Sequence, residues 1–168
     1  MTALFVLGGA RSGKSRYAQT RAETMPGELI FIATAQAFDA EMTSRIARHR
    51  ADRDLRWRTV EAPIALAEAI VENSAPSRVL LVDCLTLWTS NLLLGEHDID
   101  VASAALECAV ITAPGPVILV ANEVGLGIVP DNALARRFRD HAGLLNQRIA
   151  AAADAVVLVT AGLPLSLK

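Results

Sequence analysis

The sequence predicts an α/β fold in which residues 1–168 form a single domain, with a mostly parallel sheet and helices on both of its faces. Two observations lead to this prediction. Short apolar segments rich in Val, Ile and Leu alternate along the chain with segments of helical periodicity, which is the pattern of parallel strands joined by crossover helices. In addition, 52% of the 168 residues are apolar, which is enough for one substantial core.

Five segments have the composition of buried strands, because they are short, rich in branched apolar residues, and bounded by glycine, proline or polar residues. These predicted strands cover residues 4–7, 29–33, 79–83, 117–121 and 155–159. Segments in which apolar residues recur with helical spacing lie between them. These predicted helices cover residues 15–24, 41–54, 65–72, 101–111 and 134–153.

A glycine-rich loop links the first predicted strand to the first predicted helix, and it matches the phosphate-binding pattern G-x-x-x-x-G-K-S. Backbone N–H groups of such a loop point at phosphate oxygens, and the helix N-terminus adds a positive dipole end. Lys14 is expected to reach the β- and γ-phosphates as a catalytic residue, and the Ser15 hydroxyl to bind Mg²⁺. The sequence therefore predicts a P-loop NTPase fold that takes a nucleoside triphosphate. The predicted phosphate contacts are Gly8, Gly9, Ala10, Arg11, Ser12, Gly13, Lys14 and Ser15.

The predicted strand at residues 79–83 ends in Asp83, where a Mg²⁺-binding carboxylate is expected in such a fold. Strands also end in aspartate for turn or helix-capping reasons, so this position alone does not decide between the two roles. The phosphate-binding loop earlier in the chain favours the metal-binding role. Asp83 and Ser15 are therefore the predicted Mg²⁺ ligands.

One histidine lies within a strongly basic segment. On a helix, Arg45 and Arg53 lie one turn on either side of His49, so positive charge follows the histidine face. Such a setting gathers triphosphate oxygens and keeps the imidazole neutral, which leaves it able to attack phosphorus. The alternative, which composition alone favours, is a solvated basic helix face with an ordinary surface histidine.

Polar residues also lie at the ends of predicted strands, where ligands bind in parallel sheets. Asn122 and Glu123 follow the strand at 117–121 and precede a glycine-rich loop, which makes them candidates for substrate contacts. Glu61 ends an extended strip that begins at Trp57, and it either hydrogen-bonds a base or ribose or belongs to a simple edge strand. Polar residues of the helix at 134–153 either face a substrate or pair with one another on a solvent-exposed face.

The bulk composition gives no reason to expect binding to nucleic acid or to a membrane surface. The formal net charge is −2, from 16 basic and 18 acidic residues. No apolar run approaches the roughly 18 residues that a membrane-spanning helix needs. Cys84 and Cys108 lack the spacing of a metal site and are expected to be reduced. With no export signal recognised, the expected location is the cytoplasm.

Several segments together resemble the bifunctional adenosylcobinamide kinase / adenosylcobinamide-phosphate guanylyltransferase family of cobalamin biosynthesis. The resemblance covers nearly the whole chain in order, and its basic histidine block, Asn-Glu-Val-Gly loop and Arg-Asp…Asn-Gln helix are specific in combination. The segments that carry it lie at residues 8–15, 31–36, 45–50, 57–61, 122–130 and 137–147.

The resemblance implies two reactions: phosphoryl transfer from ATP or GTP to adenosylcobinamide, then GMP transfer from GTP to the resulting phosphate through a guanylylated histidine. By motif position, His49 is the implied nucleophile. The resemblance also implies Mg²⁺ as cofactor, adenosylcobinamide and a nucleotide as partners, and a homo-oligomer, specifically a trimer. The further nucleotide contacts that it implies are Ala33, Thr34, Ala35, Arg50, Ala51, Asp52, Arg53, Glu61 and Asp83.

Two positions depart from the family pattern, in which Ser often stands at Ala35 and Glu at Asp83. Aspartate keeps the carboxylate but shortens its reach by one methylene. Two other functions remain open from the residues themselves. One is a P-loop small-molecule kinase without a covalent step, and the other is a nucleotide-operated switch or ATPase that drives a partner.

Overall fold

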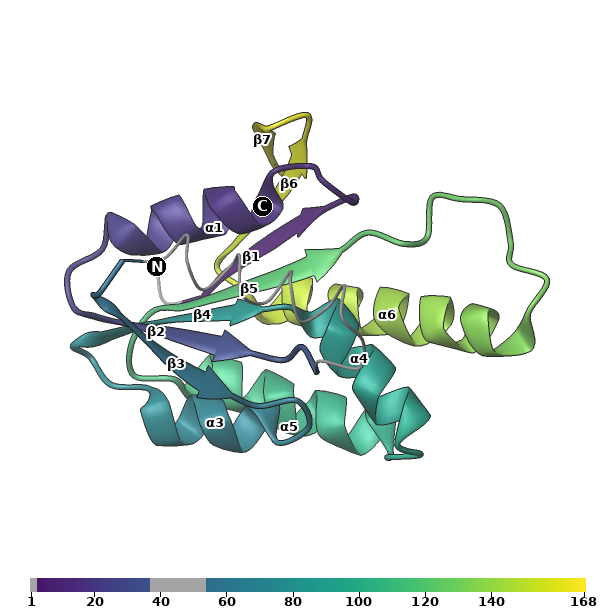
Figure 1. The fold of residues 1–168 in the computed structure, drawn as a ribbon, viewed down its shortest axis with the longest axis horizontal. Coiled ribbons are helices and arrows are strands. Elements are labelled where there is room, and N and C mark those ends of the chain that lie inside the picture. The colour runs from purple at the N-terminus through teal and green to yellow at the C-terminus, as the bar shows by residue number, and fades with distance from the viewer. Residues whose placement is uncertain (1–2, 37–53) are drawn as a thin grey trace.

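The computed structural model describes residues 3–36 and 54–168, which are drawn in colour in Figure 1. Apart from Asp54, the helix predicted at 41–54 lies outside the described residues. The same is true of five residues that the sequence places in the site: His49, Arg50, Ala51, Asp52 and Arg53.

The described chain builds one seven-stranded sheet in the order β3-β2-β4-β5-β1-β6-β7 (Figure 1). Six strands are parallel, and only β7 runs antiparallel, beside β6. The five predicted strands are all present within one or two residues of their expected bounds, and the strip that ends in Glu61 forms the edge strand β3. The strands are β1 (Ala3–Gly8), β2 (Glu28–Ala33), β3 (Trp57–Glu61), β4 (Arg78–Asp83), β5 (Val117–Asn122), β6 (Ala155–Thr160) and β7 (Leu163–Ser166).

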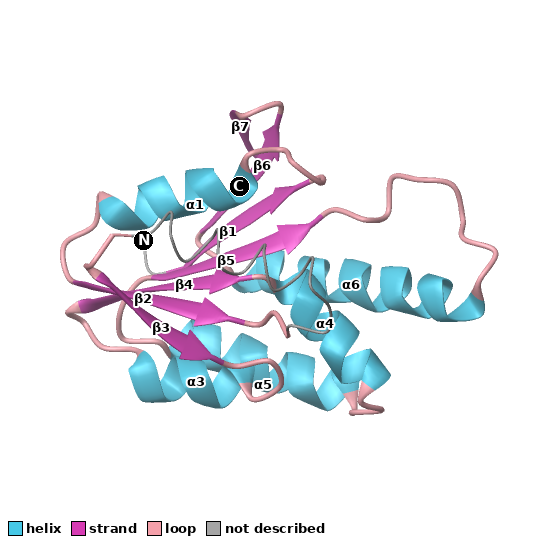
Figure 2. Ribbon diagram, viewed as in Figure 1, coloured by secondary structure: helices cyan, strands magenta, loops and turns pink. Residues whose placement is uncertain are grey.

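Helices cover both faces of the sheet, as predicted, but unevenly. Among the described helices, α1 alone lies on one face, and α3, α4, α5 and α6 lie on the other (Figure 2). The side chains of β1 show why both faces are needed, because Leu4 and Val6 pack on the α1 side whereas Phe5 and Leu7 pack on the opposite side. The helices are α1 (Lys14–Glu23), α3 (Leu66–Asn73), α4 (Leu85–Leu94), α5 (Ile99–Thr112) and α6 (Ala133–Ala152).

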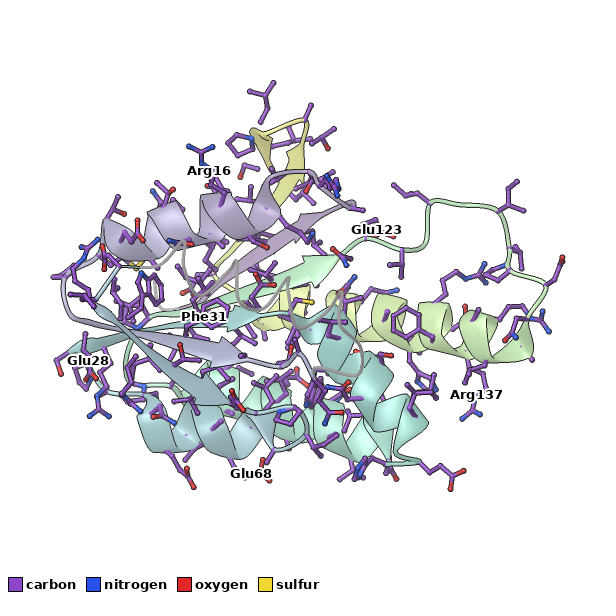
Figure 3. The ribbon with its side chains drawn as sticks, viewed as in Figure 1. Arg16, Glu28, Phe31, Glu68, Glu123 and Arg137 are labelled. Atoms are coloured by element: carbon purple, nitrogen blue, oxygen red, sulfur yellow. The ribbon has the colours of Figure 1, made fainter. Side chains whose placement is uncertain are left out.

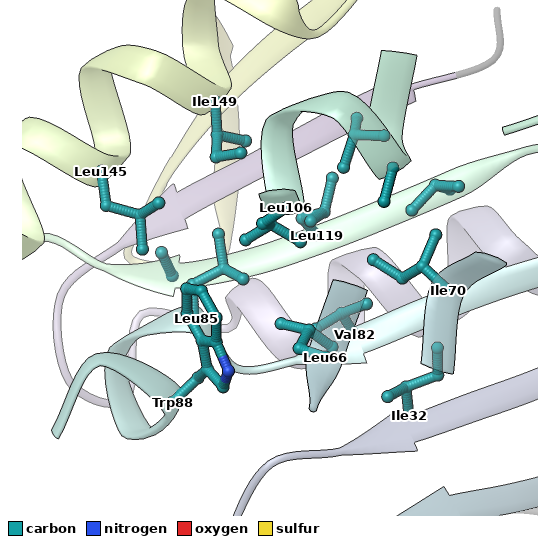
Figure 4. Packing of buried hydrophobic residues seen from close by; sticks show 14 of the residues in the cluster. Ile32, Leu66, Ile70, Val82, Leu85, Trp88, Leu106, Leu119, Leu145 and Ile149 are labelled. Atoms are coloured by element: carbon teal, nitrogen blue, oxygen red, sulfur yellow. The ribbon is translucent and has the colours of Figure 1, made fainter. Parts of the chain in front are cut away.

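The larger core lies between the sheet and the four helices on one face, as Figure 4 shows. Strand residues such as Leu119 and Val82 meet helix residues such as Leu106 and Ile149 there, all of them buried. Trp88 is buried in the same core, and its indole N–H donates to the carbonyl of Ile64 at 2.7 Å. Complete burial of the central strands fixes their register and therefore fixes where each strand ends.

Two elements were not predicted, α4 and β7. Seven of the ten residues of α4 are buried, so the helix has no polar face to give it an amphipathic pattern. All four residues of β7 are exposed, so this strand has no apolar alternation against a core. Both elements nevertheless bear on the site, because α4 begins directly after β4 and the turn before β7 packs on the phosphate-binding loop.

Candidate nucleotide-binding site

The predicted site residues of the described chain lie along the carboxyl edge of the parallel strands. In the sheet register, Gly8 of β1 pairs with Asn122 of β5, and Ala33 of β2 pairs with both Asp83 of β4 and Glu61 of β3. Four strand intervals separate β1 from β3, which at about 4.8 Å each gives a row of about 19 Å. The phosphate-binding loop lies at one end of this row and Glu61 at the other.

The phosphate-binding loop curls back onto itself before entering α1. The amide of Ser12 donates to the carbonyl of Gly9 at 3.3 Å, and Gly13 caps α1 with φ +95°, a left-handed value that favours glycine. Lys14 is the first residue of the helix and only 9% exposed. Its ammonium group donates to the carbonyl of Gly9 at 3.3 Å, so the side chain lies over the loop rather than out in solvent.

Neighbouring elements hold this loop from two sides. The amide of Gly162, in the turn between β6 and β7, donates to the carbonyl of Ser12 at 2.8 Å, and the amide of Glu123 donates to the carbonyl of Gly8 at 3.1 Å. A Cβ placed on Gly13 would lie 3.3 Å from the Cα of Gly162, so the two backbones approach closely. Only a glycine just after a strand, which is a common turn signal, pointed to this contact from the sequence.

Gly8 is required by the same packing. A Cβ at this position would overlap the Ser12 hydroxyl and lie 2.6 Å from the carbonyl of Val159 on β6. The hydroxyl of Ser12 is itself buried and has no hydrogen-bond partner. The loop therefore contains a polar group that is paired with nothing in the protein and lies beside the backbone amides expected to face phosphate.

A buried threonine joins the ends of β2 and β4 next to Asp83. Thr34 is fully buried, and its hydroxyl donates to the carbonyl of Cys84 at 2.7 Å while accepting from the amide of Cys84 at 2.8 Å. Ala33 and Ala35 on either side are half-buried. Burial, and then the charge of the adjacent Asp83, raise the pKa of the Cys84 thiol to about 11, so this thiol stays protonated at neutral pH.

Asn122 and Glu123 lie directly beside the phosphate-binding loop, because β5 is the neighbour of β1. Figure 3 shows Glu123 at the tip of β5, where the chain enters the long loop to α6. The carboxylate of Glu123 accepts from the backbone amide of Gly125, and the backbone amide of Asn122 donates to the hydroxyl of Thr86 at 2.6 Å. The side-chain oxygen of Asn122 is buried and has no hydrogen-bond partner. These two residues are thus closer in sheet order to Gly8 than Asp83 is.

Several polar residues of α6 pair with other groups of the protein. Arg148 forms an ion pair with Glu107 of α5 at 3.4 Å, and Arg139 pairs with Asp140 next to it in the chain. Asn146 differs, because its side-chain amide reaches the carbonyl of Asn122 at 3.5 Å. One polar group of this helix is therefore brought to the carboxyl edge of the sheet.

The described residues contain neither a cluster of metal ligands nor a membrane-spanning helix. Within residues 3–36 and 54–168, no three or more His, Cys, Asp and Glu side chains come together in a way that could hold a metal ion. None of the helices described in these ranges has the length and apolar character to cross a membrane.

Comparisons with known proteins give a consistent result. Residues 4–167 match the family described as cobinamide kinase / cobinamide phosphate guanyltransferase. A bifunctional adenosylcobalamin biosynthesis protein from Pseudomonas aeruginosa, CobP, is 50% identical over 97% of this chain and 95% of that protein. The CobU proteins of the same description from Salmonella typhimurium and Escherichia coli are 43% and 42% identical over 98% of this chain and 99% of theirs.

A solved structure from Pyrococcus horikoshii OT3 has a similar fold, with a TM-score of 0.54 over 99% of this chain and 85% of that one. The two chains are 10% identical, so this likeness concerns the fold alone.

Proposed function

The chain belongs to the cobinamide kinase / cobinamide phosphate guanyltransferase family, and from that premise we propose that it performs both reactions of the bifunctional enzyme. It phosphorylates adenosylcobinamide with ATP or GTP, and it then transfers GMP from GTP to adenosylcobinamide phosphate. The product is adenosylcobinamide-GDP, with pyrophosphate released. The observation that carries the proposal is the phosphate-binding loop at one end of a row of strand-end polar residues that includes Asn122, Asp83 and Glu61.

The kinase step needs the γ-phosphate held in line with an acceptor hydroxyl. Backbone amides of residues 8–15 bind the phosphate oxygens, and Lys14 moves from the carbonyl of Gly9 to the phosphates when a nucleotide enters. The acceptor hydroxyl releases its proton to water as its oxygen bonds to the γ-phosphorus, the bond from that phosphorus to the bridging oxygen breaks, and the nucleoside diphosphate leaves. Asn122 and Glu123, beside the loop, are the proposed contacts for the acceptor substrate.

The donor set fits Mg²⁺ by its chemistry. Ser15 lies in the first turn of α1, and Asp83 ends β4 at the same edge of the sheet, so a hydroxyl and a carboxylate are available. Mg²⁺ prefers such hard oxygen ligands and is commonly held by one or two protein groups together with substrate phosphates. When bound, the ion neutralises charge that develops on the phosphate oxygens.

The guanylyl step uses His49 as nucleophile. A ring nitrogen bonds to the α-phosphorus as pyrophosphate leaves, and the phosphate of the corrinoid then displaces the histidine, which breaks the P–N bond. Arg50, Ala51, Asp52 and Arg53 contact the same nucleotide. The proposal for these residues rests on their motif position, because residues 37–53 lie outside the described residues.

The remaining nucleotide contacts follow the row of strand ends. Ala33 and Ala35 are half-buried at the end of β2 and flank the buried Thr34, and Glu61 is exposed at the end of β3. Glu61 lies about 19 Å from Gly8 in strand spacing, which supports a role at the ribose and base end of a nucleotide rather than at its β- and γ-phosphates. We also propose a homo-oligomer, specifically a trimer, that acts in the cytoplasm.

Labelling with nucleotides tests the covalent step. The protein is incubated with Mg²⁺ and either α-³²P-GTP or γ-³²P-GTP. Acid-labile, hydroxylamine-sensitive label from the α position alone is expected, and it disappears in His49→Ala. His97→Ala and His141→Ala serve as matched controls and keep the label. Label that survives His49→Ala contradicts a guanylyl-histidine at this position.

Transfer assays separate the alternatives. The bifunctional enzyme transfers γ-phosphate to adenosylcobinamide in wild type and in His49→Ala, but it transfers GMP only in wild type. A kinase without a covalent step gives γ-phosphate transfer and no α-label in any form. A nucleotide-operated switch hydrolyses nucleotide without regard to cobinamide and is stimulated by a protein partner.

A further inference from the structure

We infer that Thr34 and Asn91 form a buried clamp that positions the ends of β2 and β4, and with them Asp83, for Mg²⁺-dependent nucleotide binding. This inference rests on the proposed function, in which Asp83 is a Mg²⁺ ligand. Thr34 and Asn91 are positioning residues in this scheme, since both act through other groups.

The hydroxyl of Thr34 is engaged twice with the residue that follows Asp83. It donates to the carbonyl of Cys84 at 2.7 Å and accepts from the amide of Cys84 at 2.8 Å. The amide of Thr34 lies 3.5 Å from the carbonyl of Asp83, to which it donates. Both backbone polar groups of Cys84, the residue after Asp83, are therefore bound by the side chain of Thr34, the residue after β2.

This arrangement excludes direct contact between the Thr34 side chain and a nucleotide. Thr34 is 0% exposed, and its hydroxyl has already used its single hydrogen and an acceptor lone pair on Cys84. The half-buried neighbours Ala33 and Ala35 are the residues of this segment that a ligand can reach. The Thr34 side chain therefore influences the nucleotide through the position of β4 and Asp83.

Asn91 extends the clamp from β2 to the segment that follows β3. This residue of α4 is 7% exposed, and both hydrogens of its side-chain amide are used. One goes to the carbonyl of Thr34 at 2.8 Å and the other to the carbonyl of Pro63 at 3.0 Å. Pro63 lies two residues after Glu61, the last residue of β3. A single chain of hydrogen bonds thus runs from the end of β3 through Asn91 and Thr34 to the residue after Asp83.

The protein also contains two closely matched residues whose hydrogen bonds do not join the carboxyl ends of the strands. Thr89 of α4 is 1% exposed, and its hydroxyl donates only to the carbonyl of Leu85 in its own helix. Asn73 of α3 is 8% exposed, and its amide donates to the carbonyl of Ala69, also in its own helix. Asn73 also accepts from Arg58, near the opposite edge of the sheet from Asp83. These residues provide controls for the loss of a buried hydroxyl or amide as such.

The first experiment compares Thr34→Val with Thr89→Val. GTP affinity is measured by titration calorimetry, once with Mg²⁺ and once with EDTA. The Mg²⁺ concentration that gives half-maximal GTP binding is then determined. Steady-state phosphoryl transfer gives kcat and KM. Residues that orient a metal ligand typically change metal affinity or activity about 10–100-fold. We expect Thr34→Val to raise the half-maximal Mg²⁺ concentration and lower kcat within this range, with GTP affinity in EDTA changed less than about 2-fold. Thr34→Ser is expected to restore both values, because it keeps the hydroxyl.

The second experiment compares Asn91→Ala with Asn73→Ala and carries the test if Thr34→Val does not fold. Asn91→Ala is expected to raise the half-maximal Mg²⁺ concentration and the KM for the nucleotide, whereas Asn73→Ala changes neither more than about 2-fold even where it lowers stability. Urea unfolding of every variant separates stability from these readouts. The inference is wrong if Thr34→Val and Thr89→Val have the same half-maximal Mg²⁺ concentration, or if Asn91→Ala and Asn73→Ala do. Absence of Mg²⁺-dependent GTP binding in wild type refutes the proposed function instead.

Discussion

Replacing Gly162 tests whether the turn between β6 and β7 holds the phosphate-binding loop in shape. Gly162 has φ +80°, and its amide donates to the carbonyl of Ser12 at 2.8 Å. A Cβ at this position would meet no atom within 4 Å. Gly162→Ala therefore introduces no steric clash, and its whole effect comes from the backbone conformation.

The magnitude follows from two opposing terms. A left-handed conformation costs a residue with a Cβ about 1–2 kcal/mol. Replacing glycine also restricts the unfolded chain, which returns about 0.4–1 kcal/mol of stability. The expected net loss is about 1 kcal/mol in the free energy of unfolding. If the turn relaxes to avoid this strain, the bond to Ser12 is lost, which at about 1 kcal/mol weakens nucleotide binding roughly 5-fold.

Urea unfolding and calorimetric titration with Mg²⁺–GTP measure the two effects. Gly162→Asn is a first control, because asparagine tolerates left-handed backbone, and it is expected to stay close to wild type. Gly127→Ala is a second control, since its Cβ also meets nothing within 4 Å and its φ is not in the left-handed range. If Gly162→Ala matches Gly127→Ala in both stability and affinity, the turn does not brace the loop.

Three further predictions concern stability and reactivity. The pKa of Cys84 is raised from 9.0 to about 11 in the folded protein. Because the unfolded chain loses this proton at a lower pH than the folded protein does, the free energy of unfolding is expected to fall by roughly 2–3 kcal/mol between pH 9 and pH 11. Urea unfolding at pH 8 and pH 10.5 is expected to show a larger fall in the free energy of unfolding for wild type than for Cys84→Ser. Equal falls in the two proteins would contradict the raised pKa. Cys108 is exposed and Cys84 buried, so a thiol reagent at pH 8 is expected to label one cysteine per native chain and two after unfolding, as mass spectrometry can count. Asp98 caps α5 by accepting from the amides of Asp100 and Val101, so Asp98→Ala is expected to cost about 1 kcal/mol in thermal or urea unfolding, and an unchanged midpoint would contradict this.

The parallel strands were predictable because their burial on both faces leaves an unbroken apolar run in the sequence. The predicted strand at 79–83 corresponds to β4 (Arg78–Asp83), and the helix predicted at 134–153 corresponds to α6 (Ala133–Ala152). Two elements, α4 and β7, could not be predicted from the sequence, for opposite physical reasons. α4 is buried almost all round, whereas β7 is exposed at every residue, so neither has the one-sided apolar pattern that reveals an element.

The sequence identified which strand ends form the candidate site, but not the order in which those strands lie in the sheet. Parallel strands joined by helices bring Gly8, Asp83 and Asn122 to one edge whatever their order in the sheet. The order itself depends on packing between distant segments, and it puts β5 rather than β4 beside the phosphate-binding loop. Contacts such as those of Asn91 and Gly162 were hidden for the same reason, since each joins residues far apart in the chain.

Under the proposed function with a single nucleotide site, two different bond cleavages would share the phosphate-binding loop. The phosphate-binding loop is held by Gly162 and Glu123 from two sides, so its backbone offers the same set of amides in both reactions. A fixed cradle of this kind orients the phosphates but does not choose between the γ- and the α-phosphorus. With the ribose placed at Glu61, as proposed above, the α-phosphorus lies nearer the Glu61 end of the row than the γ-phosphorus does. Under the proposed function, the group that selects guanylyl transfer must act from that side, and the proposed nucleophile His49 stands in the sequence between β2 and β3, the two strands at the Glu61 end of the sheet order.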